Sequence, residues 1–251
     1  ISVLFDETIE SLDIKPDGLY VDCTCGGAGH SSAILKNIKN GTLVAIDRDP
    51  DAIKVINERI GSNDCVEIVN DNFFNIKNIL GERKADGILA DLGVSSFQLD
   101  TAERGFSFHK DAPLDMRMSK SGISAEDIIN DFSETELSDI FFRFGEEKFA
   151  RKIASRIVSE RKIKRITTTT QLAEIIANAY PSAARRDAHP ARKCFQAVRI
   201  AVNGELDRLN EALDKAFDLL NKDGVLAIIT FHSLEDRMVK QRFKEFCTGC
   251  T

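Results

Sequence analysis

A glycine-rich loop between an apolar run and a helical pattern is the part of this chain best suited to chemistry. The run Leu19–Val21 is followed by Asp22 and by the compact loop Gly26–Gly29, and a helix-period pattern begins at Ser31. A strand, a tight loop and a helix N-terminus in this order gather backbone N–H groups at one point, which suits a nucleotide-like ligand. We therefore expect the chain to bind a nucleoside cofactor.

Two further carboxylates stand at the ends of strand-like runs. Asp47 ends the run 42–47, 21 residues after Gly26, a distance typical of an acid that binds ribose hydroxyls. Asp91 ends the run 86–91, and a carboxylate at a strand terminus is commonly ligand-binding or catalytic. The loop lacks the G-x-G-x-x-G spacing of a dinucleotide site and a Walker lysine, and it resembles the first motif of S-adenosylmethionine methyltransferases.

The elements that must position these residues alternate between strands and helices. Apolar strand-like runs occur at 19–22, 42–47, 65–69, 86–91 and 224–231. This alternation predicts a mostly parallel, doubly wound α/β sheet, and the nearly continuous apolar runs indicate burial on both faces. The carboxyl ends of parallel strands share one edge, so we expect the loop and both acids to meet there.

The gap before the fifth strand is largely helical. Ser124-x-x-Asp127, Ser133-x-x-Glu136 and Thr168-x-x-Gln171 are typical helix starts, the last two as capping boxes. We predict an all-helical domain over 104–199, inserted into a discontinuous core of 1–103 and 200–251. A single long helix is expected over Ala197–Leu220, despite Gly204, as the return to the sheet.

Charge is distributed unevenly along the 251 residues, whose formal net charge is −6. The segment 104–199 holds 18 Lys/Arg against 13 Asp/Glu, whereas the remainder holds 16 against 27. Eight basic residues fall within Lys148–Arg165, where Glu160 is the one acid. A polyanion could dock on the inserted segment although the whole chain is acidic.

Cysteine usage and hydropathy bear on location and metal content. The six cysteines are scattered, which favours free thiols in a reducing cytoplasm. The pairs Cys23/Cys25 and Cys247/Cys250 are each a weak zinc signal, and we expect no metal. No apolar run approaches the roughly 18 residues of a membrane span. The chain has no initiator Met and is interpreted as the ordered part of a longer protein.

Several motifs beyond the loop occur together in the order of one known family. They are Asp91–Ser96, Gln98–Asp100, Glu103–Phe108, Pro113–Met118, Phe144–Glu147, His189–Ala191, Phe195–Ile200 and Phe231–Arg237. With Gly26–His30, they strongly resemble the bacterial 16S ribosomal RNA cytosine-N4 methyltransferases, and the resemblance covers essentially the whole chain. Members of that family carry a helical insertion at the position deduced above.

The resemblance implies S-adenosylmethionine as cofactor and a decoding-centre cytidine of 16S rRNA, in the small ribosomal subunit, as substrate. It places the cofactor on Ala28, Gly29, His30, Asp47, Phe73, Asp91 and Gln98. Asp91 is also our candidate catalytic group, as the acceptor of a hydrogen bond from the cytosine amino group. Residues expected to contact RNA are Arg104, Arg117, Arg185, Arg186, His189, Arg199 and His232. Monomer and homodimer both stay open.

The chain departs from the family pattern at three places. Cys23 and Cys25 stand where the family has Gly and an apolar residue, and Phe97 stands where it often has Pro. The family also continues for several tens of residues beyond Thr251. Two alternatives remain open: a methyltransferase acting on DNA or a small molecule, and a non-catalytic cofactor-binding factor in ribosome assembly.

Overall fold

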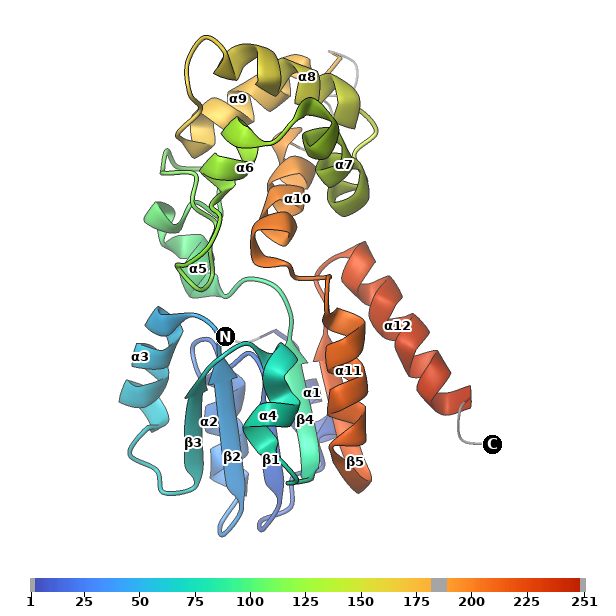
Figure 1. Cartoon of the computed structure of the whole chain (residues 1–251). Coiled ribbons are helices and arrows are strands. Elements are labelled where there is room, and N and C mark those ends of the chain that lie inside the picture. The colour runs from blue at the N-terminus through green and yellow to red at the C-terminus, as the bar shows by residue number, and fades with distance from the viewer. Residues whose placement is uncertain (1–2, 182–188, 249–251) are drawn as a thin grey trace. The chain divides into compact units, whose positions relative to one another are not determined.

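The computed structural model describes residues 3–181 and 189–248 (Figure 1). It divides into a sheet unit, Ile1–Ser95 with Leu206–Thr251, and a helical unit, Ser96–Glu205. These boundaries lie outside the expected segment 104–199, so residues 96–103 and 200–205 are grouped with the helices.

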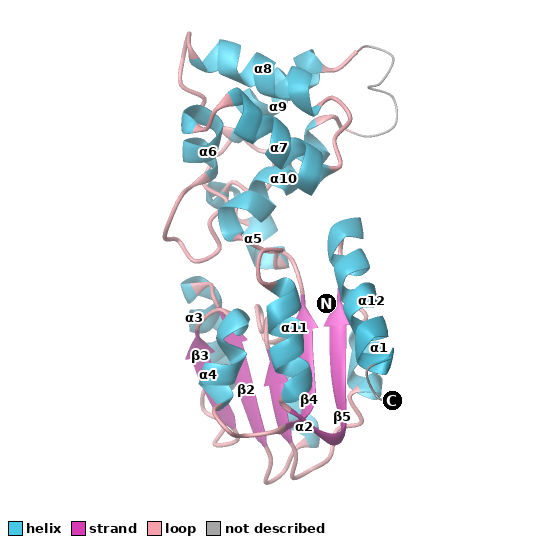
Figure 2. Ribbon diagram, turned by 45° about the vertical axis from the view of Figure 1, so that its right-hand side comes forward, coloured by secondary structure: helices cyan, strands magenta, loops and turns pink. Residues whose placement is uncertain are grey.

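The sheet unit is built on five parallel strands in the order β3-β2-β1-β4-β5 (Figure 2). They are β1 (Leu19–Asp22), β2 (Thr42–Asp47), β3 (Val66–Asn70), β4 (Ala85–Asp91) and β5 (Leu220–Ile229). The first two have the predicted bounds, and the next two differ by one residue at their ends. β5 begins earlier than expected because an irregularity lets Leu220 pair with Ala85 before the regular register starts at Val225.

Strand residues alternate between two apolar layers, one on each face of the sheet. Tyr20 packs into one cluster and Val21, its neighbour, into the other, as the two-residue period of a strand requires. The first cluster is covered by α1 (Phe5–Ser11), α2 (Gly29–Asn37) and α3 (Pro50–Ile60). The second is covered by α4 (Ile76–Leu80), α11 (Leu209–Asp218) and α12 (Ser233–Thr248). The doubly wound α/β fold is confirmed.

In the part of the helical unit that the structure describes, two short turns of helix precede five longer helices. These are α5 (Ser96–Asp100), η2 (Ala102–Arg104), α6 (Ala125–Asp131), α7 (Glu134–Gly145), α8 (Ala150–Arg161), α9 (Thr169–Ala179) and α10 (Ala191–Asn203). Ser124 and Ser133 each form a reciprocal capping box with the acid three residues on. Thr168 caps α9 without the predicted reciprocal bond, because the Gln171 side chain accepts from Thr167 N–H instead.

The single long helix expected over 197–220 is wrong. α10 ends at Asn203 because Gly204 adopts a left-handed conformation with φ of 58°, which terminates the helix. A separate helix, α11, begins at Leu209 in the sheet unit. α10 begins at Ala191, directly after His189 and Pro190.

The topology fixes where a ligand can reach the sheet. Strand order reverses between β1 and β4, the two strands that end in Asp22 and Asp91. In open parallel sheets, ligands bind outside the carboxyl ends of the strands at such a reversal. Among the described residues, no helix is both long and apolar enough to span a membrane.

Candidate active site at the carboxyl ends of the strands

The conformation of the loop after β1 is fixed by the buried carboxylate of Asp22. Asp22 is 1% exposed; its two carboxylate oxygens accept bonds from Ser31 Oγ at 2.6 Å and from Thr24 N–H at 3.2 Å. Gly26 and Ala28 both have positive φ, at 51° and 59°, which turns the chain sharply into α2. The first N–H groups of α2 therefore face the carboxyl edge of the sheet, where they can bind an anionic group.

Asp47 ties the same loop to the end of β2. Its Oδ2 accepts from Gly26 N–H at 2.7 Å, and its Oδ1 accepts from Asp49 N–H at 2.8 Å. Burial raises the pKa of Asp47 to about 6 despite these two bonds. A carboxylate has about four acceptor positions, so both oxygens can still accept from ligand hydroxyls.

Asp91 presents an oxygen for which the described residues supply no hydrogen bond. Its backbone N–H donates to Thr24 Oγ1 at 2.6 Å, whereas its Oδ1 is buried without a partner. His30 lies beside it, with Nδ1 4.0 Å from Asp91 Oδ2, and stacks on Phe5 with ring centroids 5.8 Å apart. His30 Nε2 is also buried and unpartnered. Buried polar atoms are normally hydrogen-bonded, so two unpartnered atoms side by side indicate a site where a polar ligand supplies the missing hydrogen bonds.

The electrostatic character of this edge distinguishes among ligands. Burial, followed by the nearby charges of Asp22 and Glu235, raises the pKa of Asp91 to about 6. Burial likewise raises the pKa of Asp22. A cluster of carboxylates that disfavour their own ionisation stabilises a cation and repels a pyrophosphate. The site therefore suits a positively charged nucleoside better than a dinucleotide.

Comparison with known proteins assigns the chain to a family. The model of the MraW methylase family matches residues 1–251. The chain belongs to this family. A Clostridium botulinum (strain Loch Maree / Type A3) protein named ribosomal RNA small subunit methyltransferase H is 55% identical over all of this chain and 83% of its own length. A Brevibacillus brevis protein of the same name is 52% identical over all of this chain and 82% of its own length.

The cofactor of this MraW-family chain is S-adenosylmethionine. The site fits it on three counts: a cationic sulfonium suits the carboxylate cluster, ribose hydroxyls suit Asp47, and a carboxylate suits the N-terminus of α2. The unpartnered Asp91 Oδ1 and His30 Nε2 leave polar capacity for the rest of the molecule.

Two of the expected cofactor residues, Phe73 and Gln98, lie on other elements than the loop after β1 and the acids at the strand ends. Phe73 lies in η1 (Phe73–Asn75), where it packs partly buried against the sheet core and meets Phe74 edge to face at 4.8 Å. Gln98 is buried at 5% exposure in α5 and belongs to the helical unit. The other expected cofactor residues of the sheet unit lie at the carboxyl ends of β1, β2 and β4. They are Ala28, Gly29, His30, Asp47 and Asp91.

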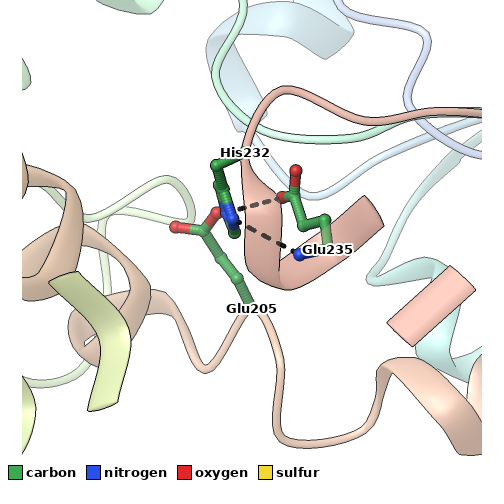
Figure 3. A group of neighbouring side chains, drawn as sticks. All are labelled: Glu205, His232 and Glu235. Atoms are coloured by element: carbon green, nitrogen blue, oxygen red, sulfur yellow. Dashed lines mark hydrogen bonds and ion pairs between the residues drawn. The ribbon is translucent and has the colours of Figure 1, made fainter. Parts of the chain in front are cut away.

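His232 and Glu235 form a compact turn at the start of α12 (Figure 3). His232 Nδ1 accepts from Glu235 N–H at 3.4 Å, while His232 Nε2 lies 3.1 Å from the Glu235 carboxylate. The Glu235 side chain is almost fully buried, and it also accepts from Phe231 N–H at 3.1 Å. In this structure His232 caps a helix, and the pair shapes the turn that follows β5.

Three of the expected RNA-binding arginines are engaged inside the helical unit. Arg104 is 7% exposed, and its Nη2 donates to the carbonyls of Arg117 and Met118, both at 3.0 Å. Arg199 makes a two-bond ion pair with Glu205, and Arg117 makes one with Asp115. These contacts hold the fold of the helical unit, so Arg104 in particular is not placed to meet a phosphate.

Replacing Arg104 by alanine is expected to destabilise the protein. The change leaves two buried carbonyls without their donor and should cost about 2–3 kcal/mol, or a fall in Tm of about 4–12 °C. Thermal unfolding measures this, with the exposed Arg151→Ala as control. A Tm equal to that of the wild type, together with weaker RNA binding by folded protein, would contradict the structural role.

The remaining expected RNA contacts precede α10 in the sequence. Arg185 and Arg186 lie outside the described residues. His189 is exposed and stacks on Phe108 with centroids 4.5 Å apart, while its Nδ1 accepts from Ala191 N–H at 3.2 Å. His189 therefore presents one edge of an aromatic pair on the surface of the helical unit.

Sequence reasoning missed the residues that hold the site together. Thr24 Oγ1 accepts a hydrogen bond from the backbone N–H of Asp91, which lies on the neighbouring strand. Ser31 Oγ hydrogen-bonds to the Asp22 carboxylate and to Cys25 Sγ, the latter at 2.9 Å. Nothing in the local pattern separates them from ordinary loop polar residues. Their role depends on strand pairing between β1 and β4, which a single sequence does not reveal.

Proposed function

We propose that this chain transfers a methyl group from S-adenosylmethionine to the N4 amino group of a cytidine in 16S rRNA of the small ribosomal subunit. The observation that carries the proposal is the carboxylate cluster at the strand ends, in which Asp91 keeps a buried oxygen unpartnered. Membership of the MraW family and the names of its relatives support the acceptor.

Different residues of the sheet unit suit different parts of the cofactor. Asp47 would bind the ribose hydroxyls, and the loop Ala28–His30 with the N-terminus of α2 would hold the methionine carboxylate. Phe73 would contribute an aromatic face for the adenine, and the Asp91 carboxylate would favour the charge of the sulfonium. S-adenosylmethionine supplies an electrophilic methyl group when bound there.

Asp91 performs the protein's part of the chemistry. The lone pair of the cytosine amino group is delocalised into the ring, so N4 is a weak nucleophile. A carboxylate that accepts a hydrogen bond from N4–H localises that lone pair and receives the proton released on transfer. With a pKa of about 6, Asp91 is ionised at neutral pH and remains basic enough for this role. Close alignment of the reacting atoms supplies much of the remaining acceleration.

Methylation at carbon 5 of cytosine would need different residues. That reaction uses a cysteine thiolate that adds to carbon 6 of the ring. Cys23 and Cys25, which lie nearest the loop, are buried, and burial raises the pKa of each thiol well above its usual value. Neither thiol is ionised at neutral pH, so the site favours transfer to the amino group.

The helical unit is our candidate for RNA binding. On α8 and the turn after it, Arg161 donates to two backbone carbonyls and Arg165 pairs with three acids. Other basic side chains in this region extend into solvent: Lys148, Arg151, Lys152, Lys162 and Lys164. Such side chains bind phosphates and fix the orientation of RNA without reading its sequence.

Charge reversal on this surface should weaken RNA binding and leave cofactor binding intact. For the double variant Lys162→Glu, Lys164→Glu, we expect RNA affinity to fall about tenfold and the salt slope, log Kd against log salt concentration, to decrease by about 1.5. The matched control is Lys222→Glu, Lys244→Glu, which reverses two exposed lysines of the sheet unit. Equal losses in the two double variants would show that overall charge, and not this surface, governs binding.

Transfer of label distinguishes the proposed acceptor from the alternatives. Full-length protein is incubated with S-adenosylmethionine labelled in the methyl group and with unmodified small subunits, DNA or total small molecules. Label in the RNA of small subunits supports the proposal. Label in DNA or in small molecules identifies another methyltransferase class, and cofactor binding without any transfer identifies an assembly factor.

A further inference from the structure

Phe231 is an aromatic side chain that stands largely in solvent at the edge of the sheet where the site lies. It follows the end of β5 by two residues, and 52% of it is exposed. Ile229, the last residue of β5, pairs with Asp91, the last residue of β4. Phe231 and the segment after Asp91 therefore leave the sheet side by side.

The backbone of Phe231 is fixed although its ring is exposed. Its N–H donates to Glu235 Oε2 at 3.1 Å, and Glu235 is 1% exposed. The ring rests on Gly93: a Cβ built on that glycine would lie 3.5 Å from Phe231 Cδ2. Gly93 also has φ of 95°, a conformation that glycine adopts readily. One part of the ring thus lies beside Gly93, and about half of the side chain is open to solvent.

This placement brings two complementary features together on adjacent strands. Asp91 offers a buried acceptor oxygen without a partner, and Phe231 offers an apolar face two residues beyond the neighbouring strand end. A flat heteroaromatic amine needs both, a surface for its ring and an acceptor for its amino hydrogen. Stacking on an aromatic side chain is also the usual way in which proteins hold a base removed from its helix.

We propose that Phe231 stacks on the target cytosine and sets the plane of the base so that N4 faces Asp91. This inference rests on the proposed function and adds the residue that binds the base. Its contribution is to base binding and orientation.

The test is a series at position 231 measured on unmodified small subunits. Phe231→Ala should lower kcat/KM about 10- to 100-fold, and Phe231→Leu nearly as much, because leucine keeps apolar volume without a planar face. Phe231→Tyr should stay within about threefold of the wild type, because its ring can stack in the same way. The Kd for S-adenosylmethionine and the Tm should not change across the series.

Phe217→Ala serves as the matched control. Phe217 is also an exposed aromatic of the sheet unit, 40% exposed, but it lies near the end of α11, just before β5 begins. Its truncation should leave kcat/KM unchanged. A Phe231→Ala enzyme with wild-type kcat/KM, or a leucine variant as active as the tyrosine variant, overturns the stacking proposal. If the wild type itself places no methyl group on the RNA, the proposed function fails instead.

Discussion

Replacing Asp91 by asparagine is expected to lower kcat for methyl transfer by about 100- to 10,000-fold, the range typical of a lost general base. Asparagine has nearly the same shape, but it lacks the charge that localises the N4 lone pair and accepts the proton. The substitution should also affect the affinities for the cofactor and for its product differently. Binding of cationic S-adenosylmethionine should weaken more than binding of its neutral demethylated product, because only the former gains from the carboxylate.

The same substitution should not destabilise the protein. The folded-state pKa of Asp91, about 6, lies above its unfolded value, so the protonated form contributes stability at low pH that is lost as pH rises through about 6. Asparagine mimics the protonated form at every pH. We expect a Tm gain of about 2–4 °C at pH 8, corresponding to about 1 kcal/mol after solvent screening, and no gain below about pH 4.

Wild-type activity should change over the same pH range but in the opposite direction. Because the ionised carboxylate accepts the hydrogen bond, kcat should fall as pH drops below about 6. Single-turnover rates and thermal unfolding of both proteins between pH 4 and 8 measure these effects. A variant that keeps more than a tenth of the wild-type kcat would show that Asp91 is not the acceptor, and a large fall in Tm would indicate a folding defect.

Asp47→Ala is expected to weaken S-adenosylmethionine binding by at least about 100-fold, as the loss of two or more charge-assisted hydrogen bonds implies. The carboxylate accepts from Gly26 N–H and Asp49 N–H, so its removal releases the loop and also removes the acceptor for the ribose. Isothermal titration calorimetry measures the Kd.

Asp64→Asn is the control for this change, since Asp64 is an exposed acid in the loop before β3. It should bind the cofactor as the wild type does. A Kd for the Asp47→Ala protein within about threefold of that of the wild type would remove Asp47 from the site.

Much of the sheet unit could be predicted because its signals are local. Leu19–Asp22 and Thr42–Asp47 are short apolar runs that end in an acid, and both are strands with those bounds. The return to the sheet could not be predicted in the same way, because residues on both sides of Gly204 continue an apolar helical pattern. The left-handed conformation of Gly204 ends α10, and a turn over residues 204–208 separates it from α11.

In the candidate site, too, some residues could be predicted from local sequence signals and others could not. Glycines and acids at strand ends are visible in the sequence because topology alone brings them to one edge. Arg104 and Lys162 look alike in the sequence, yet one is buried against two carbonyls and the other is exposed. The place of Phe231 depends on the register of β4 with β5 and on contact with Gly93, which are properties of the folded chain.

Identification of the methylated nucleoside tests the central claim most directly. Small subunits from cells that lack the enzyme are treated with full-length protein and S-adenosylmethionine, and the RNA is digested and analysed by liquid chromatography and mass spectrometry. The account predicts N4-methylcytidine with the wild type and almost none with the Asp91→Asn protein. Appearance of 5-methylcytidine, or of a methylated nucleoside other than cytidine, would contradict it.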